Sequence, residues 1–253
     1  MKFFILFFLL LSMLACSSAP NKEGLTEAEV LYKNAKEAIA KKNYFQAGLD
    51  LNNLKSKHSY SFYAIDAELL LADIEFLQKN YVEAANQYRI FRELHPTYKN
   101  SDYVLNQMAI AYKEQVPSTY DRDLGALYQS MNLFRELVIK YPESTYVSNA
   151  QKELQKGNEV IIKKERYIAD FYFRTKSYQS ARYRYLDILK SYNEPWLVQE
   201  GVERILISTL KLKEYEQCEQ IAGEFGAQYV DQLSKITEIK NRCSALKSKG
   251  STL

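Results

Sequence analysis

The fold of this chain is decided by a short pattern that first occurs as Asn43-Tyr44-Phe45-Gln46-Ala47. The pattern places a small residue three positions after a tyrosine, and it recurs as Asn80-Tyr81-Val82-Glu83-Ala84, Ser177-Tyr178-Gln179-Ser180-Ala181 and Glu214-Tyr215-Glu216-Gln217-Cys218. The first two small residues are 37 positions apart, and so are the last two. A fixed period of this length indicates stacked structural repeats.

The residues around each small residue indicate what the repeats are. Twelve positions earlier the chain has Ala35, Ala72, Ala169 or Leu206, and large apolar residues follow four and seven positions later in most copies. Small residues let two consecutive helices approach closely, while large residues bury against the next pair. This is the tetratricopeptide (TPR) pattern, and it predicts an all-α, TPR-like α-solenoid of about five helix-pair repeats.

The solenoid is expected to span residues 27–246, with a frayed tail at 247–253. The repeats are expected at residues 28–58, 62–96, 103–142, 162–192 and 199–227, followed by a C-terminal helix. Thr26 and Glu29 form a capping box, which places the start of the first helix near Glu27. The third repeat carries an insertion at Gln115–Gly125. Tyr146–Arg174 should form an extended or kinked helix with a weak break at Gly157-Asn158.

Composition excludes several classes of protein. With only 8 Gly and 5 Pro among 253 residues, the chain lacks the turn formers of an all-β domain. A formal net charge of +3 is too small for a general nucleic-acid binder. Two histidines, three cysteines and no phosphate-binding motif leave little material for a metal site, a cofactor or catalysis. We therefore expect a protein that is not an enzyme, with no cofactor and no nucleic-acid partner.

The N-terminus resembles the signal of a bacterial lipoprotein. Lys2 precedes an apolar run from Phe3 to Leu14, which is too short to span a membrane but typical of a signal peptide. Ala15-Cys16 then resembles a lipobox, so residues 1–15 would be removed and Cys16 acylated, with 16–26 as a flexible tether. Attachment to the membrane would be through the lipid alone. A plain secretory signal followed by an incidental cysteine is the alternative.

Motifs in the second half of the chain extend the resemblance beyond TPR periodicity. They are Tyr120-Asp121-Arg122-Asp123, Phe134-Arg135-Glu136-Leu137-Val138, Tyr141-Pro142-Glu143-Ser144-Thr145-Tyr146 and Ile168-Ala169-Asp170-Phe171-Tyr172. Together with the lipobox and the repeats, they make the chain similar to the BamD family, the TPR lipoproteins of the outer-membrane β-barrel assembly machinery. The departures are Asn193 after Tyr192, where the family often has Tyr-Pro, and a weak second half of repeat five.

This resemblance implies a non-enzymatic scaffold at the periplasmic face of the outer membrane. Its partners would be the periplasmic domain of BamA, other lipoproteins of the assembly complex and unfolded outer-membrane proteins. Ser17 fits this location, because many lipoproteins kept at the inner membrane have Asp there. The alternative is a TPR lipoprotein that coordinates peptidoglycan synthesis or cell-division machinery.

Two surfaces are candidates for binding partners. The repeat register predicts that one concave face is lined by Tyr32, Lys36, Ile39, Leu69, Asp73 and Phe76. The hypothesis is that this face is a substrate groove for an extended apolar-aromatic peptide, and the alternative is a groove lining that binds no ligand. The family resemblance implies that Arg184, with Arg182 and Tyr183, contacts an acidic site on BamA. Both arginines are expected to point away from the core; the alternative for Arg184 is a local pair with Asp187.

Charge and cysteines add two further observations. Residues 163–190 carry a net charge of +5 and residues 66–94 a net charge of −3. This charge difference has two interpretations. The charged residues simply lie on solvent-exposed helix faces, or the two halves of the chain bind different partners. Cys218 should be buried and Cys243 should lie on the following helix; whether the two form a disulfide is left open by the sequence.

The lipobox interpretation makes a direct prediction. Cys16→Ala should leave a protein that carries no lipid label and is uncleaved or mislocalised, because the acylated thiol is gone. Metabolic labelling with a fatty-acid probe measures this, and a wild-type protein that takes up no label would contradict the interpretation.

Overall fold

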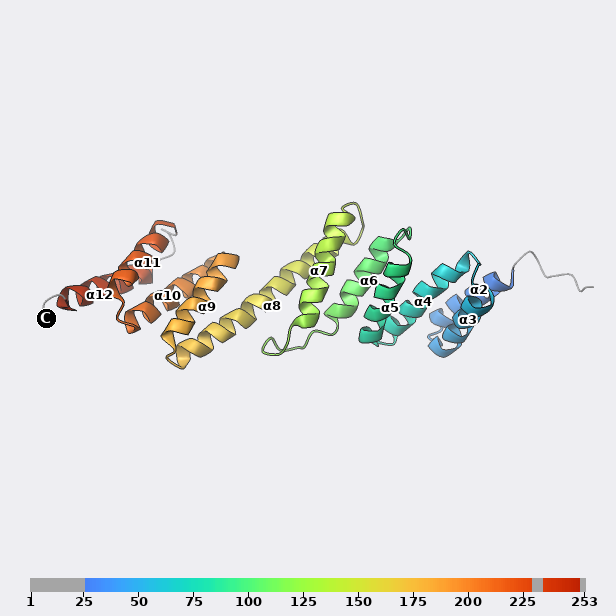
Figure 1. Cartoon of the computed structure of the whole chain (residues 1–253), viewed down its shortest axis with the longest axis horizontal. Helices are drawn as coiled ribbons and strands as arrows, with labels where there is room; N and C mark the ends of the chain where they lie inside the picture. The colour runs from blue at the N-terminus through green and yellow to red at the C-terminus, as the bar shows by residue number, and fades with distance from the viewer. Residues whose placement is uncertain (1–25, 229–233, 251–253) are drawn as a thin grey trace, which may run out of the picture. The chain divides into compact units, whose positions relative to one another are not determined.

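The computed structural model describes residues 26–228 and 234–250, and all regular structure in these residues is helical. Consecutive helices form antiparallel pairs, so the predicted all-α fold of TPR-like helix pairs is confirmed (Figure 1). The chain divides into two compact units, Met1–His95 and Pro96–Leu253. The predicted signal peptide, Cys16 and almost all of the tether lie outside the described residues.

Unit 1 contains two helix pairs. They are α2 (Glu27–Ala40) with α3 (Tyr44–Lys57), and α4 (Tyr63–Leu77) with α5 (Tyr81–Leu94). Helix α2 begins as the capping box predicts, since the Thr26 hydroxyl accepts a hydrogen bond from the Glu29 amide at 3.3 Å. The small residues of both pairs are fully buried: Ala35, Ala47, Ala72 and Ala84 each have 0% exposure. The helices of each pair therefore meet at the positions that the repeat predicted.

Unit 2 contains the remaining repeats and a final helix. Its helices are α6 (Ser101–Lys113), α7 (Gly125–Lys140), α8 (Val147–Arg174), α9 (Tyr178–Ser191), α10 (Pro195–Lys211), α11 (Tyr215–Gln228) and α12 (Ser234–Gly250). Helix α12 continues to Gly250, so the helix extends past Lys247, where fraying was expected. In the irregular third repeat, the buried Ser130 hydroxyl donates to the Ala109 carbonyl at 2.8 Å. A small residue thus keeps α6 and α7 close despite the insertion.

Four lysines form the tight turns within the regular repeats. Lys42, Lys79, Lys176 and Lys213 have φ values of 58°, 65°, 62° and 62°. The amide of the residue after each lysine bonds back to a carbonyl of the preceding helix, as in Asn80 to Glu75 at 2.9 Å. The same left-handed turn therefore recurs wherever the tyrosine pattern follows.

The weak break expected at Gly157 is absent from helix α8. The helix is continuous over 28 residues, and Gly157 is buried inside it. A β-carbon at this position would lie 2.6 Å from Met131 Sδ and 2.9 Å from Met131 Cγ. Gly157 is therefore a contact point where α7 packs closely against α8, not a helix breaker.

The insertion before α7 lies against α8. The Lys164 ammonium donates to the Arg122 carbonyl at 2.6 Å, and the rings of Tyr120 and Tyr167 meet edge-on with centroids 5.8 Å apart. These contacts attach a segment without helical structure to the longest helix of the unit.

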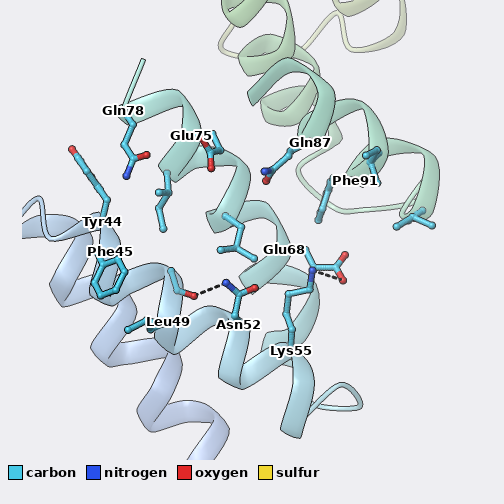
Figure 2. Close-up of a pocket in the computed structure, with 15 residues that line it drawn as sticks. Tyr44, Phe45, Leu49, Asn52, Lys55, Glu68, Glu75, Gln78, Gln87 and Phe91 are labelled. Atoms are coloured by element: carbon cyan, nitrogen blue, oxygen red, sulfur yellow. Dashed lines mark hydrogen bonds and ion pairs between the residues drawn. The ribbon is translucent and has the colours of Figure 1, made fainter. Parts of the chain in front are cut away.

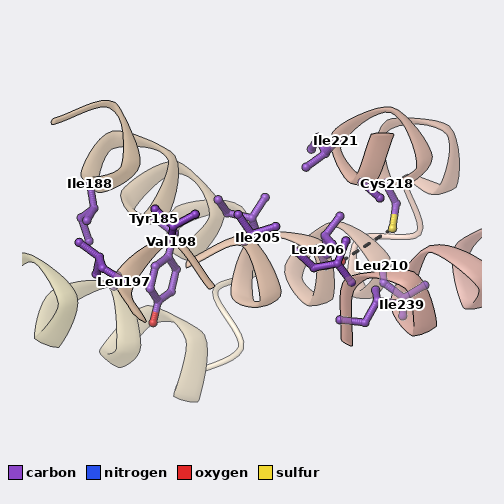
Figure 3. Packing of buried hydrophobic residues seen from close by; sticks show 14 of the residues in the cluster. Tyr185, Ile188, Leu197, Val198, Ile205, Leu206, Leu210, Cys218, Ile221 and Ile239 are labelled. Atoms are coloured by element: carbon purple, nitrogen blue, oxygen red, sulfur yellow. Dashed lines mark hydrogen bonds between the residues drawn. The ribbon is translucent and has the colours of Figure 1, made fainter. Parts of the chain in front are cut away.

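The C-terminal core of unit 2 joins α8 to α12 (Figure 3). Tyr185, Leu197, Ile205 and Leu206 are fully buried in it. Cys218 and Cys243 form a disulfide, with Cα atoms 6.2 Å apart, which answers the question that the sequence left open. The disulfide ties α12 covalently to α11 across residues 229–233.

The packing at Gly157 predicts opposite effects for the same substitution at two helical glycines. Gly157→Ala forces the buried Met131 to move, at a cost of up to about 3 kcal/mol. The gain in helix propensity is at most about 1 kcal/mol, so the substitution should destabilise the protein. Gly223→Ala, where a β-carbon meets nothing within 4 Å, should stabilise the protein by up to about 1 kcal/mol. Urea unfolding measures both, and shifts of the same sign would contradict this interpretation.

Candidate partner-binding surfaces

Aromatic and charged side chains gather in unit 1 where α2 and α4 are in contact. The rings of Tyr32 and Tyr63 stack with centroids 5.0 Å apart, and the Lys36 ammonium lies 5.6 Å from the Tyr32 ring centroid. Burial, followed by the charge of Asp66, raises the pKa of the Tyr32 hydroxyl. The cluster therefore offers flat apolar rings, a neutral hydroxyl and an exposed cation on one surface.

The structure changes the predicted substrate groove. Leu69 is only 7% exposed and packs in the interior. The Asp73 carboxylate accepts a hydrogen bond from the Tyr88 hydroxyl at 2.6 Å, and the Phe76 ring packs edge-on against Tyr81 at 5.5 Å. Leu69 is therefore buried, whereas Asp73 and Phe76 are half-buried and pack within the second repeat.

The three predicted groove residues of the first repeat, Tyr32, Lys36 and Ile39, all lie on α2. Ile39 and Tyr32 both pack, half-buried, against the core of unit 1, while Lys36 is exposed. Tyr63, which stacks on Tyr32, was missed by the sequence analysis. It begins α4, outside the register that selected the other residues, and only the contact between α2 and α4 identifies it.

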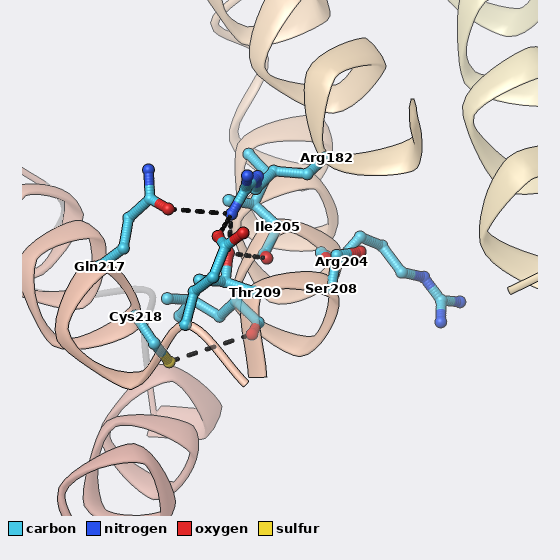
Figure 4. Close-up of polar contacts among 9 residues, drawn as sticks. Arg182, Arg204, Ile205, Ser208, Thr209, Gln217 and Cys218 are labelled. Atoms are coloured by element: carbon cyan, nitrogen blue, oxygen red, sulfur yellow. Dashed lines mark hydrogen bonds and ion pairs between the residues drawn. The ribbon is translucent and has the colours of Figure 1, made fainter. Parts of the chain in front are cut away.

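The expectation that Arg182 points outward is wrong. Its side chain is only 14% exposed, and its guanidinium forms an ion pair with Glu214. The same nitrogen donates to Gln217 at 3.1 Å and to Thr209 at 3.5 Å (Figure 4). Arg182 therefore links α9 to α10 and to the α10–α11 turn, where it stabilises the contact between repeats four and five.

Tyr183 and Arg184 do face outward. Tyr183 is 64% exposed, and the Arg184 side chain is 40% exposed. Both border a surface hollow of about 350 Å³, whose other lining residues are Tyr172, Gln179 and Ser180. Arg184 pairs with Glu165 at 3.7 Å, not with Asp187 as the local alternative supposed. An exposed pair of this length contributes little to stability and can exchange for a partner carboxylate.

Both histidines lie at the C-terminal ends of helices, where each one contacts a glutamate. His58 ends α3 and lies 3.4 Å from Glu27, while His95 ends α5 and lies 2.8 Å from Glu68. Within residues 26–228 and 234–250, no three His, Cys, Asp or Glu side chains are grouped to hold a metal ion. In the same residues, no helix is long and apolar enough to cross a membrane.

Comparisons with known proteins match most of the chain. A family model described as "YfiO: Outer membrane lipoprotein" matches residues 26–222. The "Outer membrane protein assembly factor BamD" of Rickettsia prowazekii is 23% identical over 199 residues, which cover 79% of this chain and 79% of the relative. The protein of the same name from Vibrio cholerae is 24% identical over 219 residues, covering 83% of this chain and 88% of the relative. Among solved structures, the TPR2AB domain of yeast Sti1 is 15% identical with a TM-score of 0.42, covering 86% of this chain and 98% of that one.

Proposed function

Because the chain belongs to the YfiO family of outer membrane lipoproteins, we propose that it is a non-enzymatic scaffold for the assembly of outer-membrane proteins. The observation that carries this proposal is the match over residues 26–222, together with relatives that are named as BamD assembly factors. Stacked helix pairs suit a scaffold, because they present extended surfaces on rigid elements. The relatives' names favour this function over one in peptidoglycan synthesis or division.

The proposed location is the periplasmic face of the outer membrane, with Cys16 as the lipid anchor. The Cys218–Cys243 disulfide supports a compartment outside the cytosol, because disulfides persist in oxidising environments. The tether from Cys16 to Thr26 would reach at most about 35 Å when fully extended, so the folded repeats would stay close to the membrane.

The proposed BamA contact is the outer face of α9, with Arg184 and Tyr183 as anchors. A planar guanidinium can bind a carboxylate through two parallel hydrogen bonds, which a lysine cannot reproduce. The net charge of +5 over residues 163–190 would favour an acidic partner surface. Arg182 acts indirectly in this proposal, because its bonds to α10 and the following turn hold α9 in place.

The proposed substrate contact is the Tyr32–Lys36–Tyr63 cluster on α2 and α4. Stacked tyrosine rings offer large contact area at low entropic cost, and Lys36 adds a cation that can meet a terminal carboxylate. An extended, aromatic segment of an unfolded outer-membrane protein fits this chemistry. The remaining assembly lipoproteins are proposed partners for which the structure offers no particular residue.

The proposed BamA contact predicts a charge-reversal effect. Arg184→Glu should weaken association with BamA by about 2 kcal/mol or more, which is roughly thirtyfold in Kd, while helicity is unchanged. Lys190→Glu on the same helix applies the same charge change and should have a much smaller effect. Co-purification from detergent-solubilised outer membranes, followed by titration, measures both. Equal BamA recovery with Arg184→Glu and wild type would exclude this surface, and absence of BamA from the wild-type preparation would overturn the proposed function.

The proposed substrate contact predicts site-specific crosslinking. A photo-crosslinking residue at the exposed position of Lys36 should capture a C-terminal peptide of an outer-membrane protein, because it lies beside the tyrosine stack. The same probe at Asn34 lies on the other side of α2, about 200° around the helix, and should capture little. Comparable yields at the two positions would argue against a specific substrate surface.

A further inference from the structure

A groove runs between α3 and α5 in unit 1, with α4 beneath it (Figure 2). Its volume is about 570 Å³, and its walls carry large apolar side chains that solvent reaches. Phe45 and Leu49 on α3 are 78% and 45% exposed, and Ile90 and Leu94 on α5 are 42% and 64% exposed. Large apolar side chains gathered along one groove are typical of binding surfaces.

The polar side chains in this groove are acidic or neutral, apart from one lysine that is already paired. Lys55 lies 3.5 Å from Glu68, which also bonds His95. The Glu75 carboxylate accepts a hydrogen bond from the Asn80 amide at 2.8 Å. No cation pairs with Glu75 among residues 26–228 and 234–250, and residues 66–94 carry a net charge of −3. The groove therefore offers a carboxylate between apolar walls.

The corresponding place in unit 2 is already occupied by a side chain of this protein. The turn lysines Lys42 and Lys176 are 134 residues apart, and the small residues Ala84 and Cys218 have the same separation. In this register Gly48 on α3 corresponds to Arg182 on α9. Arg182 crosses from α9 to the next repeat and bonds three side chains there, as Figure 4 shows.

The partners of Arg182 have counterparts at the groove of unit 1. Thr209, Glu214 and Gln217 correspond to Glu75, Asn80 and Glu83. Glu75 lines the groove, and Glu83 is exposed on α5. Unit 1 thus keeps hydrogen-bond acceptors in the place where unit 2 binds a guanidinium, but it lacks the arginine.

Gly48 lines the groove and places no side chain in it. A β-carbon added at Gly48 would meet no atom within 4 Å, so folding does not require a glycine here. Glycine inside a helix is less favourable than alanine, because it loses more backbone entropy on folding. Gly48 therefore makes α3 less stable than alanine would, and it leaves the space between α3 and α5 unfilled.

We propose that this groove binds an arginine-bearing segment of a partner protein, whose guanidinium takes the place that Arg182 fills in unit 2. The guanidinium would bond the Glu75 carboxylate, and apolar residues beside the arginine would pack on Phe45 and Leu49 or on Ile90 and Leu94. Charge complementarity and the internal counterpart select this occupant. The proposal goes beyond the assembly function and does not depend on it.

The experiment uses the purified, folded chain and a random-peptide phage library as the probe. Selected peptides should share an arginine flanked by apolar residues, and replacing that arginine by glutamine should weaken binding at least tenfold. Gly48→Arg should fill the groove with the protein's own guanidinium and weaken the same peptides at least tenfold. Gly223→Arg is the matched control, because it adds the same side chain at an open helical glycine elsewhere and should leave binding unchanged.

A second variant keeps the test valid if Gly48→Arg fails to fold. Glu75→Gln removes the carboxylate but retains a side-chain oxygen that can bond Asn80, and it should also weaken arginine peptides about tenfold. Circular dichroism and thermal unfolding check the fold of each variant. The proposal is overturned if no peptides are enriched, if enriched peptides lack arginine, or if folded Gly48→Arg or Glu75→Gln binds them as wild type does.

Discussion

The close contact between the two helices of each repeat is the constraint on which the rest of this structure depends. Ala35 with Ala47, Ala72 with Ala84, and Ala169 with Ala181 all have no exposed surface. Larger side chains at these places would push the helices apart and open the interior. In repeat five the pair is Leu206 and Cys218, where a larger residue on one helix is matched by a small one on the other.

Two buried tyrosines show how this contact is supported by polar bonds. Tyr88 donates to Asp73 and Tyr185 donates to Asp170, each at 2.6 Å, so the second helix of the repeat is bonded to the first. Burial first, and then the hydrogen bond to Asp170, raises the pKa of the Tyr185 hydroxyl. Because the folded pKa is raised, the hydroxyl's contribution to stability is present below about pH 10 and is lost as the pH rises further.

A regular interior leaves the outward positions free to differ. The same backbone position is Gly48 in unit 1, where it lines a groove, and Arg182 in unit 2, where its guanidinium pairs with Glu214. These outward positions are the ones at which a partner can be contacted, because the buried positions are occupied by the packing of the repeats.

The sequence by itself determined the helix pairs and the small-residue contacts, because these depend on residues close along the chain and on a fixed period. The tertiary structure alone decided which of the residues predicted to face outward are exposed and which are bonded to other helices. Arg182 and Arg184 differ by two positions on one helix, but only Arg182 reaches acceptors on α10 and the turn before α11. Likewise, the sequence predicts a helix break at Gly157, but Gly157 packs against Met131. The sequence also predicts that Leu69 lines a groove, but Leu69 is buried. Each outcome depends on a neighbour from another helix, and the period of one helix does not specify that neighbour.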